Sequence, residues 1–192
     1  MSRILFYDTE TTGTDFKRHS IIQIAGILEI DGVEVDRFTF NVRPHEKAAI
    51  EDAALTANGH KREDLPGYPE MKTVLKGIKY FLGKYVDPFD KTDKLHLAGY
   101  NNRGFDDNFF RMFFTLCGDN FFGAYFWPDT IDVLSLASHH LIEARDTMPS
   151  FKLHRVAKTL GVEVDDSLLH TALCDVELTI AIYKKVAPTS LY

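Results

Sequence analysis

The sequence predicts an α/β protein built as one mixed five-stranded sheet with helices on both faces. Three strand-like stretches joined by short connections open the chain, and helices and strands alternate after them. Short connections pair strands antiparallel, whereas a helix between two strands lets them pair parallel. Because 192 residues suffice for one substantial core and are too few for two ordinary domains, we expect residues 1–192 to form a single domain.

The first three strands are expected at 4–7, 21–30 and 33–42. The first is a short apolar run of the kind found in a buried central strand. Asp31-Gly32, between the other two, is a strong hairpin signal. Because the apolar residues that follow do not alternate cleanly, we expect a bulge near residues 36–37.

Apolar spacing and end signals predict the remaining elements. Apolar residues three and four apart predict the helix that begins at Met71, and glycines end two other helices, at Gly59 and Gly161. In chain order, the expected elements are helices at 47–58 and 71–82, a strand at 95–100, a helix at 105–116, a strand at 124–127, and helices from 131, at 151–160 and at 171–186.

The charge of the chain limits its partners. The sequence holds 22 basic and 28 acidic residues, a net charge of −6, which counts against a broad basic surface for long nucleic-acid duplexes. An enzyme that engages only a chain end, with metal ions neutralising phosphates, remains compatible with this charge. The sequence has no run of about eighteen apolar residues and no charged-then-apolar leader, so we expect a cytoplasmic protein that does not act at membranes.

Two carboxylates, Asp8 and Glu10, end the first apolar run. Side chains two apart on a strand share a face, so these like charges repel unless a cation lies between them. Hard divalent cations such as Mg²⁺ prefer carboxylate oxygens. The alternative is that Asp8 caps a turn and Glu10 is solvated, and this stretch alone does not decide. Asp106 follows a later strand, and sites in such sheets gather at the carboxyl ends of central strands.

Three motifs bring these carboxylates together with others. They are Asp8-x-Glu10, Asn102-x-x-Phe105-Asp106-x-x-Phe109 and His170-x-x-x-x-Asp175. In this order they resemble the motifs of the DEDD superfamily of 3′-5′ exonucleases, in its His-containing (DEDDh) branch. That branch includes the proofreading subunits of replicative DNA polymerases and RNase T. The resemblance runs almost end to end and implies a ribonuclease H-like fold for a single exonuclease domain.

The resemblance also implies catalytic roles. Asp8, Glu10, Asp106 and Asp175 would bind two Mg²⁺ or Mn²⁺ ions, and two such ions can stabilise both the attacking and the leaving oxygen of a phosphodiester. His170 would be the general base, because an imidazole titrates near the working pH. Asp107 is a rival to Asp106, but the spacing between Phe105 and Phe109 favours Asp106.

Contacts to the substrate are predicted around the same motifs. Thr11, Thr12 and Gly13 would present backbone N–H groups and hydroxyls to the terminal nucleotide. Asn102 and Phe105 would line the pocket for the 3′ end, with ordinary core packing as the alternative for Phe105.

Other polar residues carry weaker expectations. Candidate phosphate contacts are Arg103, Lys152 and Arg155, although a basic residue on a helix is usually only solvated. The remaining singled-out histidines lack a carboxylate partner pattern, and we interpret them as structural or solvated: His60, His139, His140 and His154.

The resulting hypothesis is a metal-dependent 3′-5′ exonuclease that releases nucleoside monophosphates from 3′ ends. The resemblance implies single-stranded nucleic acid as the substrate, with DNA favoured over RNA, a role in proofreading or DNA repair, and a polymerase or another replication protein as a partner. Trimming of RNA is the alternative within the same chemistry, since the motifs do not report a 2′-hydroxyl. Two further readings are an inactive ribonuclease H-like interaction module and a metal-dependent phosphatase of small nucleotides.

Overall fold

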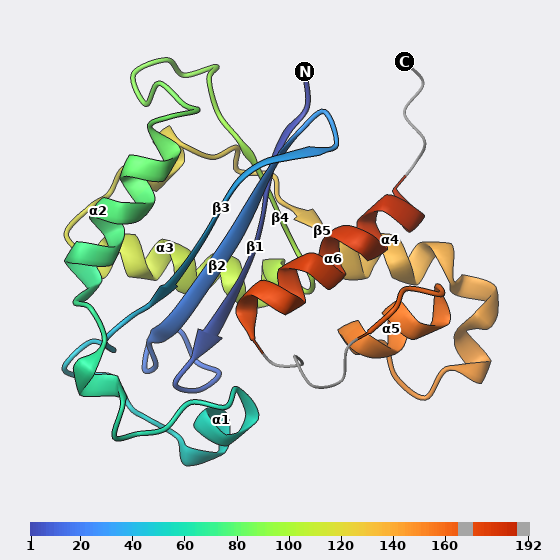
Figure 1. Cartoon of the computed structure of the whole chain (residues 1–192), viewed down its shortest axis with the longest axis horizontal. Helices are drawn as coiled ribbons and strands as arrows, with labels where there is room; N and C mark the ends of the chain where they lie inside the picture. Colours follow the sequence, from blue (N-terminus) through green and yellow to red (C-terminus); the bar gives the residue numbers. More distant parts are fainter. Residues whose placement is uncertain (165–170, 188–192) are drawn as a thin grey trace.

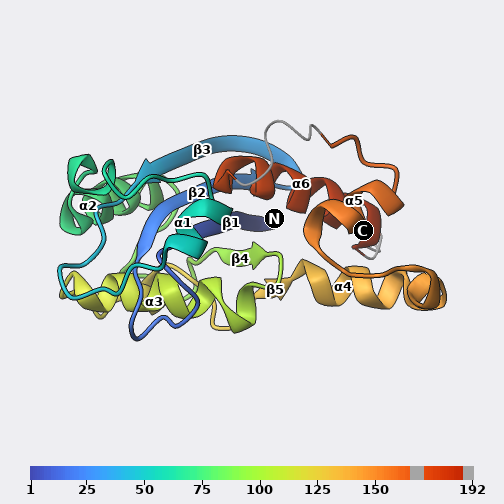
Figure 2. The same ribbon diagram turned by 90° about the horizontal axis from the view of Figure 1, so that it is seen from below.

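A computed structural model of the chain describes residues 1–164 and 171–187. In this part of the chain a central sheet carries helices on both faces (Figures 1 and 2). The strands are β1 (Arg3–Thr11), β2 (Ile21–Ile30), β3 (Val33–Asn41), β4 (His96–Gly99) and β5 (Ile131–Asp132). The helices are α1 (Asp52–Ala57), α2 (Met71–Leu82), α3 (Asp106–Leu116), α4 (Val133–His140), α5 (Leu153–Thr159) and α6 (Ala172–Val186).

The sheet has five strands in the order β3-β2-β1-β4-β5, which confirms the predicted mixed sheet. The two hairpin connections pair β1 with β2 and β2 with β3 antiparallel, while β4 and β5 run parallel to β1. The expected bulge is present: Leu28 pairs with Asp36 and Glu29 with Glu34, which leaves Val35 as the extra residue. β1 therefore occupies the centre of the sheet.

The two faces of β1 supply two separate cores. Leu5 and Tyr7 point into an aromatic cluster beneath α2 and α3, and this cluster is the larger one. Ile4 and Phe6 point to the opposite face, where Val176 of α6 packs against them. Figure 2 shows α6 and α3 on opposite sides of the sheet. Side chains of β1 with even numbers therefore face α6, and this alternation decides where its carboxylates point.

The predicted strand at 124–127 is wrong. A 3₁₀ turn, Phe122–Ala124, occupies the start of this stretch, and only an isolated bridge joins Phe126 to Leu95. The segment instead fills the aromatic core, where the Phe110 and Phe122 rings meet edge to face at 5.3 Å. The fifth strand is β5, at Ile131–Asp132, because that is where the chain comes alongside β4.

Several predicted helices begin later than expected, and the structure gives the reason for two of them. The helix expected from residue 131 begins at Val133, where the Asp132 side chain accepts a hydrogen bond from the Leu134 N–H at 3.0 Å and caps it. The helix expected at 47–58 is only α1, Asp52–Ala57. Its expected first turn does not form because the backbone before α1 bonds to the β1–β2 loop instead.

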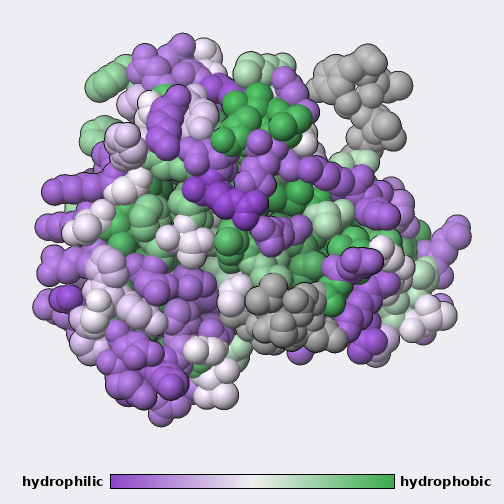
Figure 3. Space-filling model, in the orientation of Figure 1, coloured by the Kyte–Doolittle hydropathy of each residue, from purple (hydrophilic) through white to green (hydrophobic). Residues whose placement is uncertain are grey.

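The surface of the described residues is mixed in polarity. Figure 3 shows hydrophilic side chains over much of the outer rim in this view, with apolar side chains in separate patches nearer the centre. Within residues 1–164 and 171–187, no helix has the length and apolar character needed to cross a bilayer.

Candidate active site

The site lies where β1 extends beyond the end of its neighbour β4. The pairing of β1 with β4 ends at Phe6, opposite Ala98, whereas β1 continues to Thr11 alongside β2. The space beyond the end of β4 is taken by the N-terminus of α3, so that Asp106 comes beside the last residues of β1. The Asp106 carboxylate accepts hydrogen bonds from the Thr9 N–H at 3.1 Å and from the Thr9 hydroxyl. A strand end and a helix start thus meet at one point.

Three carboxylates gather on the α6 side of this strand end. Asp8 and Glu10 share the face of Phe6, and α6 packs across that face with Asp175 in its first turn. Thr171 caps α6, with its hydroxyl accepting from the Cys174 N–H. One oxygen from each carboxylate lies within 4.8 Å of the others. This spacing suits oxygen ligands around a hard divalent cation, and an all-carboxylate donor set is the kind that Mg²⁺ or Mn²⁺ takes.

The electrostatics of the cluster also favour a bound cation. Burial, and then the charges of Asp106, Glu10 and Asp175, raise the pKa of Asp8 well above its ordinary value. Burial and the Asp175 charge raise the pKa of Glu10 to about 7, against a hydrogen bond from Asn58 that lowers it. Burial raises the pKa of Asp106 to about 7, although its bonds to Thr9 oppose the shift. The raised pKa values mean that these carboxylates take up protons more readily than free ones do, and a bound metal would compete with those protons.

Asp106 and Asp107 have different surroundings. Asp106 lines an open pocket, whereas Asp107 lies beneath it and does not line it. The buried Asp107 carboxylate accepts three hydrogen bonds, from the hydroxyl of Tyr7, from the Asn102 amide at 3.2 Å and from the Thr130 hydroxyl at 2.8 Å. Asp107 therefore ties α3 to β1 and to the segment before β5, and so holds the position of its neighbour Asp106.

The open pocket beside the carboxylates has a volume of about 350 Å³. Of the residues predicted to contact substrate, Thr11, Gly13 and Phe105 line it. Thr12 and Asn102 have no exposed surface and do not line it. The Thr12 hydroxyl donates to the Ala49 carbonyl at 2.7 Å, and the Asn102 amide donates to Asp107. These two residues lie beneath the pocket and support its walls. The motifs had instead suggested that both contact the substrate.

Several residues that sequence reasoning missed also line this pocket. They are Thr9, Thr14, Ala54, Ala57, Asn58, Tyr100 and Asn101. Asn101 has φ 61° and ψ 24°, a left-handed backbone that is unusual for a residue other than glycine. Its place directly after β4 was the available signal, since sites gather at strand ends. No pattern in the sequence pointed to α1 as the opposite wall.

A second pocket, of about 510 Å³, opens on the other side of Asp8 and Asp175. Its lining includes Phe151, Lys152 and His154. Lys152 is exposed there, as a phosphate contact would have to be, and His154 lies closer to the carboxylates than its interpretation as a structural or solvated residue implied.

The other two candidate phosphate contacts lie elsewhere. The Arg103 guanidinium donates to the Thr130 carbonyl at 2.9 and 3.2 Å, which is a structural role, and Arg155 is exposed but does not line either pocket. The predicted general base, His170, lies outside the described residues.

Comparison with known proteins gives a consistent set of relatives. Over residues 5–183 the chain matches the RNase T family of exonucleases. It is 29% identical over 180 residues to the PolC-type DNA polymerase III of Halalkalibacterium halodurans, and 30% identical over 184 residues to that of Staphylococcus haemolyticus. These alignments cover 93% and 94% of this chain but only 11% of each relative.

Solved structures share the fold. Exonuclease I of E. coli in complex with a dT13 oligonucleotide matches with a TM-score of 0.76 and 24% identity, covering 96% of this chain and 40% of that one. A zinc-bound form of the complex of the same enzyme with single-stranded DNA matches with a TM-score of 0.78 and 23% identity, covering 97% and 40%.

Proposed function

The chain belongs to the RNase T exonuclease family of DEDD 3′-5′ exonucleases, and from this premise we propose that it removes nucleoside monophosphates from the 3′ end of single-stranded DNA by two-metal-ion hydrolysis. The observation that carries the proposal is the charge of the open pocket. Its described lining includes Asp8, Glu10, Asp106 and Asp175 but no Lys, Arg or His. A polyanion would be repelled from such a pocket, so bound divalent cations are needed to make it a phosphate site.

Each carboxylate has a proposed part in holding the two ions. Asp8 is central, because the charges of Glu10, Asp106 and Asp175 all act on it, and it would help to hold the ions together with those three carboxylates. The ions, when bound, would neutralise phosphate charge and make the attacking water more acidic. Thr9 orients the Asp106 carboxylate through two hydrogen bonds, so this ligand is held in place before any metal binds.

His170 is proposed as the general base that takes the proton from the attacking water. The support is its position in the motif, five residues before Asp175. Asp175 itself lies beside Asp8 and Glu10 in the structure. We expect His170→Ala to bind Mn²⁺ as the wild type does and to hydrolyse about 10²-fold more slowly, the usual size of a general-base contribution. A variant that cleaved at the wild-type rate would remove this residue from the mechanism.

The terminal nucleotide is proposed to occupy the open pocket. Its volume of about 350 Å³ suits a small ligand. Phe105 offers a ring, and its partial exposure separates it from the fully buried phenylalanines of α3. Thr11 and Gly13 offer backbone to the sugar and phosphate, and the exposed Lys152 beside the second pocket is the proposed contact for the next phosphate.

The preference for DNA and the biological role are extensions of the comparisons. The relatives include PolC-type DNA polymerase III, and the similar solved exonuclease I structures hold DNA oligonucleotides. We therefore propose a single exonuclease domain that acts in proofreading or DNA repair, with a polymerase or another replication protein as a partner. Trimming of RNA is the alternative, and it uses the same carboxylates.

The test is a time course with 5′-labelled single-stranded DNA and RNA of matched sequence, run with Mg²⁺, Mn²⁺ or EDTA. The expected result is a ladder that shortens from the 3′ end, faster for DNA, and stops in EDTA. Asp8→Ala serves as the control for a contaminating nuclease. Faster loss of RNA would replace the DNA preference with RNA trimming. No shortening of either strand by folded protein would favour an inactive interaction module or a phosphatase of small nucleotides.

A further inference from the structure

The open pocket has two walls that come from different parts of the chain. One wall is the end of β1 and the loop after it, with Thr11, Gly13 and Thr14. The other wall is α1 and the residue that follows it, with Ala54, Ala57 and Asn58 on the lining. Since the terminal nucleotide is proposed to lie between these walls, their separation decides how well it is held.

The α1 wall has little apolar packing of its own. The helix is six residues long, and Leu55 is its one buried residue, in a small cluster with Ile22 and Leu65. A helix this short is not stable by itself and takes its position from tertiary contacts. The contacts that place α1 against the other wall must therefore be mainly polar.

A row of backbone hydrogen bonds joins the two walls. The Glu51 N–H donates to the Thr12 carbonyl at 2.9 Å, and the Ala49 N–H donates to the Arg18 carbonyl at 2.7 Å. The Asn58 amide adds a bond to the Thr11 carbonyl at 3.1 Å. These bonds fix the edge of the wall, but none of them holds a side chain at the start of α1.

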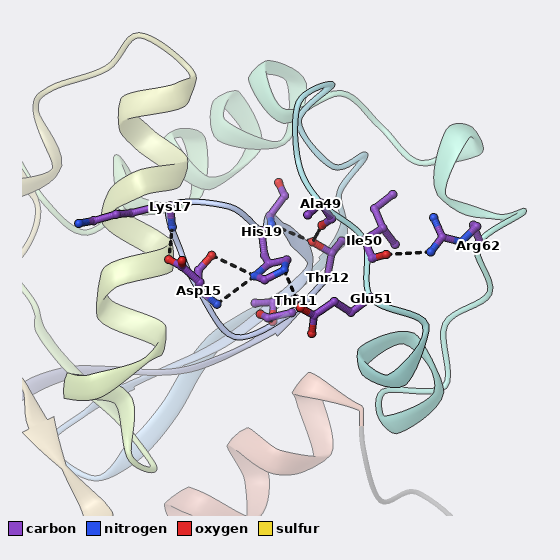
Figure 4. Close-up of polar contacts among 11 residues, drawn as sticks. Thr11, Thr12, Asp15, Lys17, His19, Ala49, Ile50, Glu51 and Arg62 are labelled. Atoms are coloured by element: carbon purple, nitrogen blue, oxygen red, sulfur yellow. Dashed lines mark hydrogen bonds and ion pairs between the residues drawn. The ribbon is translucent and has the colours of Figure 1, made fainter.

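His19 supplies that contact from inside the β1–β2 loop. Its side chain is only 2% exposed, and its Nε2 lies 3.1 Å from a carboxylate oxygen of Glu51, the N-cap residue of α1, close enough for an ion pair but without the alignment of a hydrogen bond. Figure 4 shows the ring between Asp15 and Glu51. Nδ1 lies 3.0 Å from the Asp15 N–H and 3.1 Å from the Asp15 carbonyl, so the backbone of Asp15 holds the other edge of the ring.

The ring of His19 is also enclosed by the other wall of the pocket. A Cβ placed on Gly13 would lie 2.5 Å from its ring atoms, so the backbone of Gly13 packs directly on the imidazole. Gly13 lines the pocket, and Glu51 starts the helix that lines the opposite side. One buried side chain thus touches both walls, through packing on one and through a polar contact on the other.

We propose that His19 is a positioning residue for the substrate: through Glu51 it sets α1 at the right distance from Gly13, and so it determines the affinity for the 3′-terminal nucleotide. This role rests on the proposed function, because it assumes that the nucleotide binds between the two walls. His19 lies outside the carboxylate cluster and takes no part in metal binding or proton transfer. Its loss should therefore weaken binding and leave the chemical step in place.

The test compares substitutions on the two sides of the contact. His19→Leu places an apolar group of similar size under Gly13 and removes both ring nitrogens, and Glu51→Ala removes the carboxylate from a half-exposed position. Each should raise KM for a single-stranded DNA oligonucleotide about tenfold with kcat within about twofold, a change equal to about 1.4 kcal/mol of binding free energy. Glu51→Gln keeps the length of the side chain and a polar oxygen beside Nε2, and should keep the wild-type KM. Matched controls are the exposed His140→Leu and Glu46→Ala.

A second measurement separates this proposal from the proposed function. Binding of thymidine 5′-monophosphate with Mn²⁺, measured by calorimetry, should weaken about tenfold in His19→Leu and Glu51→Ala. If the wild type binds this nucleotide and the variants lose affinity while no strand is cleaved, the exonuclease proposal fails but the positioning role of His19 stands. The positioning role is overturned if folded variants keep the wild-type KM and nucleotide affinity, if kcat falls with KM unchanged, or if Glu51→Gln behaves as Glu51→Ala does.

Discussion

The two sides of the open pocket are built in opposite ways. On the α3 side, the helix that carries Asp106 is rooted in the aromatic core by Phe109, Phe110 and Phe113, which are all buried. On the α1 side, the helix that faces it has Leu55 as its one buried residue. The carboxylates proposed to bind metal thus sit on deeply packed elements, whereas the wall proposed to hold the nucleotide stands on a few polar contacts.

This difference indicates which side chains must be held in exact positions. Buried carboxylates that repel one another cost stability, and only a packed core can hold them in position. A nucleotide wall has no such charge to restrain, and a lightly packed wall can adjust to different bases. We therefore expect substitutions on the α3 side to change turnover or global stability, and substitutions on the α1 side to change KM.

The largest effect is expected from the carboxylates themselves. Asp8→Ala or Asp175→Ala should lower turnover by at least about 10³-fold, because each removes a proposed metal ligand from a site that works through its ions. Metal-free Tm should stay equal or rise, since each variant also removes a repelling charge. Turnover and thermal unfolding of the same preparations would test both. Retained activity in a folded variant would show that the catalytic ligands lie elsewhere.

A smaller but still large effect is expected beneath the pocket. Asp107→Ala leaves the buried Tyr7 and Thr130 hydroxyls and the Asn102 amide without their acceptor, which should lower the free energy of unfolding by about 2 to 3 kcal/mol. Urea unfolding measures this, with the exposed Asp129→Ala as the control. Activity should also fall, because Asp106 is the next residue. A variant as stable as the wild type would mean that α3 is held by its phenylalanines alone.

The third prediction concerns pH and metal. The folded-state pKa values of Glu10 and Asp106 are both raised, to about 7, from ordinary values of 4.5 and 3.8. Between about pH 4 and pH 7 the folded protein therefore binds more protons than the unfolded chain. The metal-free stability should fall as the pH rises through this range. The loss should amount to a few kcal/mol, since one pKa unit corresponds to about 1.4 kcal/mol.

Thermal unfolding between about pH 5 and 8, with EDTA or with Mn²⁺, measures this effect. Mn²⁺ binds the deprotonated carboxylates and should restore stability near neutral pH and above. A Glu10→Gln, Asp106→Asn double variant should flatten the profile in EDTA. A metal-free Tm that rises steadily with pH would contradict the assignment of these shifts.

The smallest effect is expected on the outer edge of the α1 wall. The Arg62 guanidinium donates to the Ile50 carbonyl at 2.8 Å and to the Asp52 carboxylate at 2.7 Å, and Figure 4 shows it reaching the segment before α1. Because this ion pair is exposed, Arg62→Ala should cost no more than about 1 kcal/mol of global stability. Faster amide hydrogen exchange in α1, with kcat unchanged, is the expected signature.

The neighbouring Lys61→Ala is the matched control for this variant, because Lys61 is exposed on the same segment. Loss of turnover in Arg62→Ala, or a fall in stability as large as that of Asp107→Ala, would break the contrast between the two sides of the pocket.

Local patterns in the sequence determined much of the fold. Period-two alternation placed Asp8 and Glu10 on one face of β1, and three- and four-residue spacing predicted α2 at its observed ends, Met71 and Leu82. The hairpin at Asp31-Gly32 and the bulge at Val35 also follow from neighbours in the chain. These features depend on backbone geometry over a few residues, which is why the sequence is enough to find them.

Tertiary structure decided the rest, because it depends on which distant segments meet. Whether 124–127 becomes a strand depends on the space left in the aromatic core, and α1 is short because the chain before it bonds to the β1–β2 loop. The hydrogen bond from Tyr7 to Asp107 and the contact of His19 with Glu51 join residues that lie far apart in the chain. The sequence by itself determined which side chains could carry the chemistry, and only the packing of α3, α6 and α1 around the end of β1 decided which of them meet there.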